Sequence, residues 1–328
     1  MRGIAPWLVG IALLPGTGWG AELRFGSPQT PAGAVAVVAS ELKVWDRHHV
    51  QVQALPFAAA INSRDAIVGG KLEIGIAGLA NFIVGAAAAD VVAIGVAVDQ
   101  CASTSVMVRA DSAIQAVPDL TGKRVGAQTG TVTHGAFVNR LLPKARLKAG
   151  DLAIVNLRFQ DMLGALGAGS LDAVTAVDPF MSTAVHGGTG RVLTDFCPFS
   201  RVPLVLATSD GILRARGDEV AGFLRGWLDA ARIFEGRPAY AAEVYGRSLK
   251  GRGYELPAEV IAQILRRLNV NADAVALSPP FIEFVKEEAQ LMHTAGPLKQ
   301  IPDWSRALRP ALLRRYYAVV CPEVNSKG

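Results

Sequence analysis

Small and neutral polar residues gather in this sequence where apolar strand-like runs end and helical patterns begin. In an open parallel sheet such loops lie on one edge, where ligands bind. Backbone N–H groups at helix starts lack helical partners and favour negative charge. Taken singly, each loop is more typical of an ordinary helix cap, so the prediction of a binding site rests on the set. The predicted ligand-binding residues are Ser27, Gln29, Thr30, Phe57, Ala58, Gly78, Asn81, Gln128, Thr129, Gly130, Thr131, His134, Gln160, Asp161 and Asp178.

The stretch DLTGKRVGAQTGTVTHGAF, residues 119–137, has the strand, glycine turn and helix start of a phosphate loop. A Walker A loop needs a lysine after its last glycine, and a dinucleotide fingerprint needs a second glycine two positions after the first. The segment around Gly126 and Gly130 meets neither requirement. A nucleotide site is therefore not expected here, whereas a cradle for another anion remains open.

Catalytic and metal-binding patterns are sparse. There is no G-x-S-x-G elbow, and no His, Asp and Glu residues have metal-ligand spacing, so we expect neither a metal nor a cofactor. His134 and Asp161 are the candidates for an acid/base pair if the protein is an enzyme. Asp178 is also a candidate helix cap, and Arg158 a candidate partner for an anion or for a carboxylate.

The elements that would position these residues alternate between strand and helix. This pattern predicts α/β architecture with mostly parallel sheets covered by helices on both faces. Strands are predicted at residues 23–27, 50–57, 71–78, 91–98, 103–111, 123–128, 153–159, 171–177 and 202–208. Helices are predicted at residues 31–45, 61–70, 81–88, 218–234, 238–249, 257–268 and 279–293.

Two parts of the chain resemble each other, which favours two similar lobes over one long sheet. Both contain a glycine, a leucine and an acid at matching positions, namely Gly70, Leu72 and Glu73, and Gly169, Leu171 and Asp172. Strand-like segments at residues 103–111 and 201–210 bracket the second part and predict a hinge of two crossing strands. The predicted domains are a signal peptide at 1–20, lobe 1 at 21–104 plus 206–328, and lobe 2 at 105–205.

Composition supports a two-domain exported protein. Of 328 residues 51% are hydrophobic, which is enough for two cores. Thirty-three Lys and Arg residues against 28 Asp and Glu residues are spread along the chain, without the basic runs of a nucleic-acid surface. Arg2, an apolar run at residues 4–14 and small residues ending at Gly20 are typical of a signal peptide. The same segment would also fit a membrane anchor or a buried helix.

Three cysteines, Cys101, Cys197 and Cys321, lie far apart, without the paired spacing of a zinc site. In an oxidising compartment two of them can form one disulfide and leave the third free. The sequence does not determine which two.

Three segments together carry a resemblance to a known family. Residues 119–126 with the following glycine and threonine, residues 165–173 with Asp178-Pro179-Phe180, and residues 70–75 resemble segments of periplasmic solute-binding proteins. These proteins serve nitrate, sulfonate and taurine ABC importers, in a group that includes binders of thiamine-pyrimidine precursors. Asp178-Pro179-Phe180 differs from the commoner Glu-Pro-Tyr by losing the phenolic hydroxyl. The cysteine-rich motif of the family's enzyme branch is absent from this sequence.

The resemblance implies a hinged, two-lobed fold of the type II periplasmic-binding-protein kind, with mixed, mostly parallel sheets. It implies a monomeric periplasmic protein that closes around a small solute and presents it to a membrane permease, and indirectly to the permease's ATPase. The mild positive charge favours a small organic anion such as a sulfonate, taurine or nitrate, whereas the phenylalanines favour an aromatic or pyrimidine-like solute. An exported enzyme or a ligand sensor on the same fold would also fit the sequence.

Overall fold

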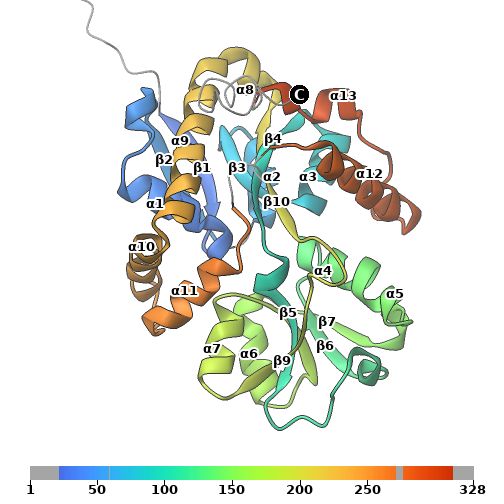
Figure 1. Cartoon of the computed structure of the whole chain (residues 1–328). Helices are drawn as coiled ribbons and strands as arrows, with labels where there is room; N and C mark the ends of the chain where they lie inside the picture. Colours follow the sequence, from blue (N-terminus) through green and yellow to red (C-terminus); the bar gives the residue numbers. More distant parts are fainter. Residues whose placement is uncertain (1–21, 59, 271–275, 313–328) are drawn as a thin grey trace, which may run out of the picture.

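The computed structural model describes residues 22–58, 60–270 and 276–312, and it contains two five-stranded sheets (Figure 1). The strand order is β2-β1-β3-β10-β4 in the first sheet and β7-β6-β8-β5-β9 in the second. The strands are β1 (Leu23–Pro28), β2 (Val52–Phe57), β3 (Ile74–Gly78), β4 (Val91–Asp99), β5 (Thr104–Arg109), β6 (Arg124–Ala127), β7 (Ala153–Asn156), β8 (Ala173–Val177), β9 (Gly190–Asp195) and β10 (Pro203–Ser209).

Helices cover both faces of each sheet. They are α1 (Ala34–Glu41), α2 (Ile61–Val68), α3 (Leu79–Ala88), α4 (Val132–Ala136), α5 (Leu142–Lys144), α6 (Phe159–Gly167), α7 (Phe180–His186), α8 (Asp210–Ala215), α9 (Gly217–Gly236), α10 (Pro238–Lys250), α11 (Ala258–Arg266), α12 (Pro279–Thr294) and α13 (Trp304–Ala307). We call the first sheet with its helices lobe 1 and the second sheet with its helices lobe 2. In Figure 1 lobe 2, drawn mainly in green, lies below lobe 1.

Each sheet is mixed because one strand runs against the other four. In lobe 1, β10 pairs antiparallel with both β3 and β4, while β1 pairs parallel with β2 and β3. In lobe 2, β5 pairs antiparallel with both β8 and β9, while β6 pairs parallel with β7 and β8. The middle strands β3 and β8, and also the edge strand β4, are buried along their whole length, as expected for strands covered by helices on both faces.

The core of lobe 1 lies on both faces of its sheet. Side chains of α1, α9, α10 and α11 pack on one face around Phe25, whose ring centroid lies 4.8 Å from that of Phe223 and 5.8 Å from that of Trp227. Side chains of α3 and α12 pack on the other face. The C-terminal helices thus complete lobe 1, and none of the described helices is long and apolar enough to cross a membrane.

Two glycine turns repeat the same hydrogen-bond network in the two lobes. The Arg24 side chain donates to Glu73 Oε1 at 2.5 Å and to the Gly70 carbonyl at 2.8 Å. Arg124 donates in the same way to Asp172 Oδ1 at 3.1 Å and to the Gly169 carbonyl at 2.8 Å. Both glycines have positive φ, 65° and 72°. The repeat predicted from sequence is therefore a structural one, since each network fixes the turn that leads into the middle strand of its sheet, β3 or β8.

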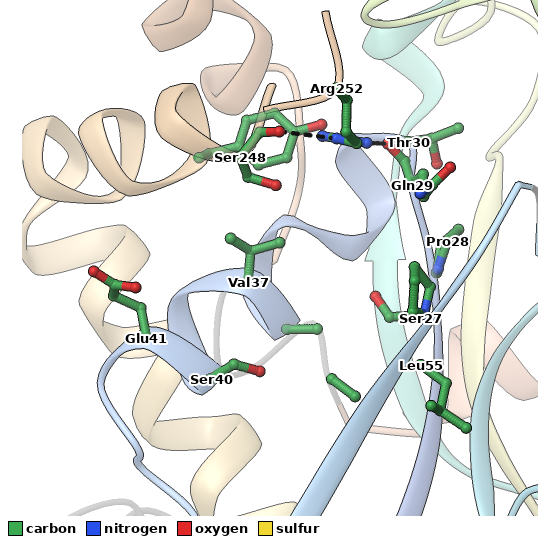
Figure 2. A pocket seen from close by; sticks show the side chains of 14 residues that line it. Ser27, Pro28, Gln29, Thr30, Val37, Ser40, Glu41, Leu55, Ser248 and Arg252 are labelled. Carbon is green, nitrogen blue, oxygen red and sulfur yellow. Dashed lines mark hydrogen bonds between the residues drawn. The ribbon is translucent and has the colours of Figure 1, made fainter. Parts of the chain in front are cut away.

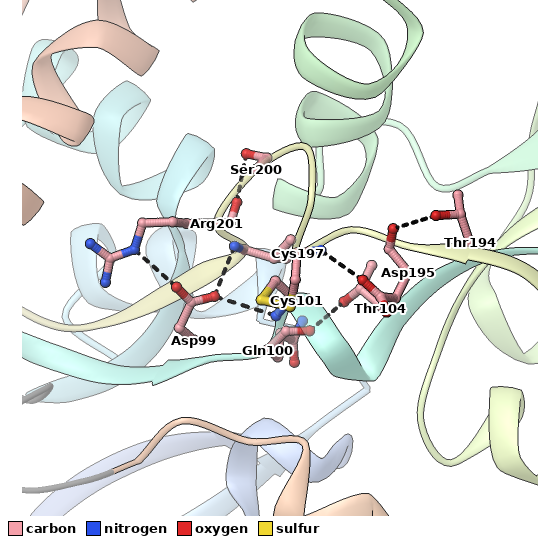
Figure 3. Close-up of a disulfide and its surroundings, with 10 residues drawn as sticks. Asp99, Gln100, Cys101, Thr104, Thr194, Asp195, Cys197, Ser200 and Arg201 are labelled. Carbon is pink, nitrogen blue, oxygen red and sulfur yellow. Dashed lines mark hydrogen bonds and ion pairs between the residues drawn. A yellow bond between two sulfur atoms is a disulfide. The ribbon is translucent and has the colours of Figure 1, made fainter. Parts of the chain in front are cut away.

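The chain passes twice between the lobes, as the predicted hinge requires (Figure 3). It leaves lobe 1 between β4 and β5 and returns between β9 and β10. Cys101 in the first passage and Cys197 in the second form a disulfide, with their Cα atoms 4.8 Å apart. The Asp99 carboxylate accepts hydrogen bonds from Arg201 Nε at 3.0 Å and from the Val202 N–H at 2.9 Å. The disulfide and Asp99 thus hold the two passages together.

Several sequence predictions differ from the structure. The helix predicted at 31–45 is a 3-10 turn at Pro31–Gly33 followed by α1, which ends at Glu41 because Lys43 has a φ of 48°. The sequence does not predict strand β9, since only its first residue is fully buried. The predicted signal peptide and Cys321 lie outside the described residues. The exact lobe limits stay predictions, although β5 begins at Thr104 and β10 at Pro203.

Candidate ligand-binding site

The predicted ligand-binding loops lie at the carboxyl ends of strands in both lobes. In lobe 1, Ser27, Gln29 and Thr30 lie at the end of β1, Phe57 and Ala58 at the end of β2, and Gly78 and Asn81 between β3 and α3. In lobe 2, residues 128–131 follow β6, Asp178 follows β8, and Gln160 and Asp161 lie in the first turn of α6. Because the strands they follow are parallel, the loops of each lobe share one edge of its sheet.

Some of these loops touch across the lobes. The Asn81 side-chain amide donates to the Gly130 carbonyl at 2.9 Å. Val132, at the start of α4, packs against the cores of both lobes. Nearby, Arg140 of lobe 2 pairs with Glu288 of α12 at 2.5 Å. The two lobes are therefore in direct contact on the side of α3, α4 and α12.

The loop after β6 satisfies many of its own polar groups. The Thr131 hydroxyl donates to the Gln128 carbonyl at 2.7 Å and accepts from the His134 N–H at 3.1 Å, so it is the N-cap of α4. The Thr129 N–H donates to the Asn156 side chain at 3.0 Å. Gly130 has a φ of 80°, a conformation that strongly favours glycine. The sequence predicts this turn correctly, and its role as a ligand contact stays a prediction.

The two residues considered as an acid/base pair have different surroundings. His134 is half-buried, and burial lowers its pKa, so the imidazole is neutral at pH 7. Asp161 forms an ion pair with Arg158 at 2.8 Å between Oδ2 and Nε. Among the described residues no hydrogen bond or ion pair joins His134 to Asp161. Gln160 beside Asp161 is exposed.

Asp178 is fully buried, and both of its carboxylate oxygens accept hydrogen bonds from the protein. Oδ1 accepts from the Ser182 N–H at 3.1 Å and from its hydroxyl at 2.6 Å, at the start of α7. Oδ2 accepts from the Ser103 hydroxyl at 2.9 Å and from Arg267 Nη1 at 3.0 Å. Arg267 follows α11 of lobe 1, so the contact joins the lobes. The role of Asp178 as a direct ligand contact stays a prediction.

A pocket of about 460 Å³ lies in lobe 1 beside the first predicted loop (Figure 2). It is bounded by α1, by the ends of β1 and β2, and by α10. Its lining residues are Ser27, Pro28, Gln29, Thr30, Ala36, Val37, Ser40, Glu41, Ala54, Leu55, Pro56, Tyr245, Ser248 and Arg252. The sequence predicts Ser27, Gln29 and Thr30 as ligand contacts, but it gives no indication that α10 contributes to the same pocket.

Arg252 brings a positive charge to this pocket. Its Nε donates to the Ser248 carbonyl at 3.1 Å, and its Nη1 donates to the Gln29 carbonyl. Its guanidinium carbon lies 5.7 Å from the centroid of the Tyr245 ring. Within the described part of the chain no carboxylate pairs with Arg252. A guanidinium without a carboxylate partner beside a pocket is suited to an anionic group.

Tyr245 also lines the pocket, but its side chain is only 1% exposed, so its hydroxyl is not open to a ligand. Arg252 is the charged group that acts on this hydroxyl. Burial raises its pKa and outweighs the opposing effect of Arg252, so the hydroxyl stays protonated. Across residues 22–58, 60–270 and 276–312 there is no group of three His, Cys, Asp or Glu side chains placed to bind a metal.

Comparison with known proteins places the chain in a family. Residues 33–241 match the family model described as NMT1/THI5 like. An Escherichia coli (strain K12) protein named for binding aliphatic sulfonates is 26% identical over 262 residues, which are 78% of this chain and 80% of that protein. The structure is similar to the alkanesulfonate-binding protein SsuA from Xanthomonas axonopodis pv. citri bound to MOPS. That likeness has a TM-score of 0.78 and 22% identity and covers 89% of this chain and 99% of the other.

Enzymes also occur among the structural neighbours. The desulfurization enzyme DSZB aligns with a TM-score of 0.69 and 15% identity, covering 91% of this chain and 99% of the other. The shared fold therefore hosts both binding and catalysis. The chain belongs to the NMT1/THI5-like family and has the two-lobed fold of periplasmic binding proteins.

Proposed function

We propose that the protein is the extracytoplasmic solute-binding component of an ABC importer. In this proposal it is exported to the periplasm, captures a small organic anion of the sulfonate kind, and delivers it to a membrane permease. The lobes close around the solute because a ligand that contacts both of them favours the closed arrangement. The permease then recognises the closed protein.

The observation that carries the proposal is the cation in the pocket beside the β1 loop. Arg252 lies against Gln29 and has no carboxylate partner among the described residues. A volume of about 460 Å³ lies in the range of small-molecule sites, which is roughly 300–1,000 Å³. The positive charge of the half-buried Arg252 would therefore meet a ligand of limited size at this position, as a small organic anion requires.

Two further observations support the proposal. The relatives named above include proteins described as binding aliphatic sulfonates and alkanesulfonates. Arg267 joins lobe 1 to the buried Asp178 of lobe 2, and this contact would stabilise a closed arrangement. The conversion of a bound solute has no comparable support, because Asp161 is paired with Arg158 rather than with His134.

A calorimetric screen of the full-length mature protein tests this function. The panel contains alkanesulfonates, taurine, nitrate, an aminopyrimidine and an aromatic acid. The proposal predicts that an anion binds at one molecule per chain and is recovered unchanged by NMR. Binding confined to the pyrimidine or the aromatic acid would overturn the anion specificity, and conversion of any bound solute would overturn the assignment as a binding protein.

A further inference from the structure

The two passages between the lobes differ in length. The first consists of residues 100–103 and the second of residues 196–202. Cys101 lies in the first passage just after β4 of lobe 1, whereas Cys197 lies in the second passage just after β9 of lobe 2 (Figure 3). Because the passages run in opposite directions, the disulfide joins the lobe 1 end of one to the lobe 2 end of the other. The bond thus crosses the hinge diagonally.

This diagonal bond restrains the bending of the hinge. Bending moves the lobe 1 end of one passage relative to the lobe 2 end of the other, and the disulfide adds a covalent connection between those ends, with Cα atoms 4.8 Å apart. Without it, the same diagonal keeps a hydrogen bond from the Phe196 N–H, which is shared between the carbonyls of Cys101 at 3.3 Å and Thr104 at 3.1 Å. A shared hydrogen bond is far weaker than a covalent bond, so loss of the disulfide should widen the range of lobe positions.

Other contacts of the hinge stay within one lobe and do not depend on the disulfide. Arg201, at the lobe 1 end of the second passage, donates to Asp99 at 3.0 Å. Its guanidinium carbon lies 5.3 Å from the ring centroid of Phe281 and 5.8 Å from that of Phe284. These described side-chain partners of Arg201 all lie in lobe 1, and each lobe has hydrophobic clusters of its own. We therefore expect reduction to loosen the hinge while both lobes stay folded.

The disulfide is within reach of a reductant in solution. Cys197 is exposed, whereas Cys101 is half-buried. The Cys197 N–H donates to the Asp195 carboxylate at 2.9 Å, and Lys144 Nζ donates to the carbonyls of residues 198 and 199, so charges of both signs lie nearby. Since access to a sulfur contributes to the rate of thiol–disulfide exchange, attack at Cys197 is favoured.

We propose that the Cys101–Cys197 bond is a redox-sensitive restraint on the hinge, and that a dithiol reductant converts the protein into a form with wider lobe opening. A thiolate of the reductant attacks and bonds to Cys197 Sγ, the bond between the two protein sulfurs breaks, and Cys101 leaves as a thiolate. The second thiolate of the reductant then attacks the sulfur that came from the first, closes the reductant's own disulfide and releases the Cys197 thiolate. Two electrons thus pass from the dithiol to the protein, and the two protons of the dithiol end on Cys101 and Cys197. This restraint goes beyond the proposed function and does not depend on it, because it concerns the hinge rather than the solute.

Small-angle scattering of the full-length mature protein without solute tests the restraint. The protein is compared before and after treatment with dithiothreitol, in a Cys321→Ser background so that the third cysteine of the sequence does not react. Alkylation and peptide mapping identify the free thiols, and circular dichroism checks that the protein stays folded. The double variant Cys101→Ser with Cys197→Ser reproduces the loss of the bond without a reductant. Arg201→Gln is the matched control, because it removes a hinge contact that lies within lobe 1.

We expect reduction to free Cys101 and Cys197 for alkylation and to increase the radius of gyration, and reoxidation with oxidised glutathione to restore the original radius. The double variant should have the larger radius from the start and should not respond to dithiothreitol. Exchange of the Phe196 amide hydrogen should become about tenfold faster on reduction, because the hinge opens more readily. Arg201→Gln should keep the radius of the oxidised protein.

Four results would overturn the proposal. If the radius and the amide exchange are the same in both redox states, the bond does not restrain the hinge. If the protein unfolds on reduction, the bond is required for the fold and is no reversible restraint. If Arg201→Gln increases the radius as much as reduction does, the diagonal position of the bond has no special role. If dithiothreitol does not reduce the bond in the folded protein, the disulfide is not accessible to a reductant.

Discussion

Cys101 and Cys197 covalently join the two passages by which the chain crosses between its lobes. Because their sequence separation is 96, the bond closes a loop that contains nearly the whole of lobe 2. A cross-link of this kind stabilises a protein mainly by restricting the unfolded chain. It also keeps the two hinge segments side by side, so that bending of the hinge moves both together.

Replacing both Cys101 and Cys197 by Ser should lower the free energy of unfolding by about 2–5 kcal/mol, the usual cost of losing a native disulfide. Urea unfolding under non-reducing conditions measures the difference. Dithiothreitol should destabilise the wild type but leave the double variant unchanged. Equal stability of wild type and variant would contradict a stabilising role for the bond.

Arg267 should hold the lobes together through Asp178. Replacing Arg267 by Gln leaves the fully buried carboxylate with its Ser103 and Ser182 contacts but without a charged partner. Loss of one partner of a buried pair is costly, and because Arg267 is partly exposed we expect a loss of about 2 kcal/mol. Arg266→Gln, at the exposed neighbouring position, is the matched control.

Small-angle scattering of the same variants adds a readout of lobe position. The Arg267 variant without ligand should have a larger radius of gyration than the Arg266 control, since one contact between the lobes is lost. An unchanged radius with lowered stability would show that Arg267 stabilises the fold without closing the lobes.

The repeated arginine networks predict a loss of stability in acid. Burial opposes the ionisation of Glu73, but hydrogen bonds and charge from Arg24 outweigh it and lower the pKa below the ordinary 4.5. Hydrogen bonds from Arg124 lower the pKa of Asp172 below the ordinary 3.8. A carboxyl whose pKa is lower in the folded state stabilises the fold fully above its unfolded pKa, and this stabilisation is lost as pH falls through the folded value.

Urea unfolding at a series of pH values tests this prediction. Stability should fall as the pH drops below 4.5 and continue to fall below 3.8. The fall should be shallower in a variant with Glu73→Gln and Asp172→Asn. Replacing Arg24 by Gln should also reduce the contribution of Glu73 to this pH dependence, because it removes the group that lowers the pKa of Glu73. A slope identical to the wild type in all variants would rule out these networks as the source.

Arg247 should determine how the pocket treats an ammonium group. Replacing Arg247 by Gln leaves Glu41, which lines the pocket, without its cationic partner. Taurine should then gain affinity relative to ethanesulfonate by no more than roughly two- to fivefold, because exposed ion pairs are weak. Calorimetry with the two ligands measures the ratio. A ratio unchanged from the wild type would show that Glu41 does not face the bound ligand.

Much of the fold can be predicted because it follows from local patterns. The buried strands are mostly apolar runs, and the turns at Gly70 and Gly169 are followed in both lobes by an acid. The arginines that bind these acids cannot be identified in the same way, because Arg24 and Arg124 lie 49 and 48 residues away from them in sequence. The partner of Cys101 is open in the sequence for the same reason, since the pairing depends on how the lobes pack.

The sequence predicts the candidate site only in part. The loop at Gln29 is recognisable because it follows a strand, but Tyr245 and Arg252 lie on and just after a C-terminal helix that folds back onto it. Tyr245 and Ser248 lie on α10, and Arg252 follows the last residue of that helix, Lys250. Only the tertiary fold determines which loop they meet.

Native mass spectrometry of the full-length mature protein with hexanesulfonate tests the central claim most directly. The account predicts a single adduct, one intact anion per chain, that is greatly reduced in Arg252→Gln and retained in Arg237→Gln. The absence of an adduct with the wild-type protein, or the release of a solute of altered mass, would contradict the assignment of this chain as an anion-binding protein.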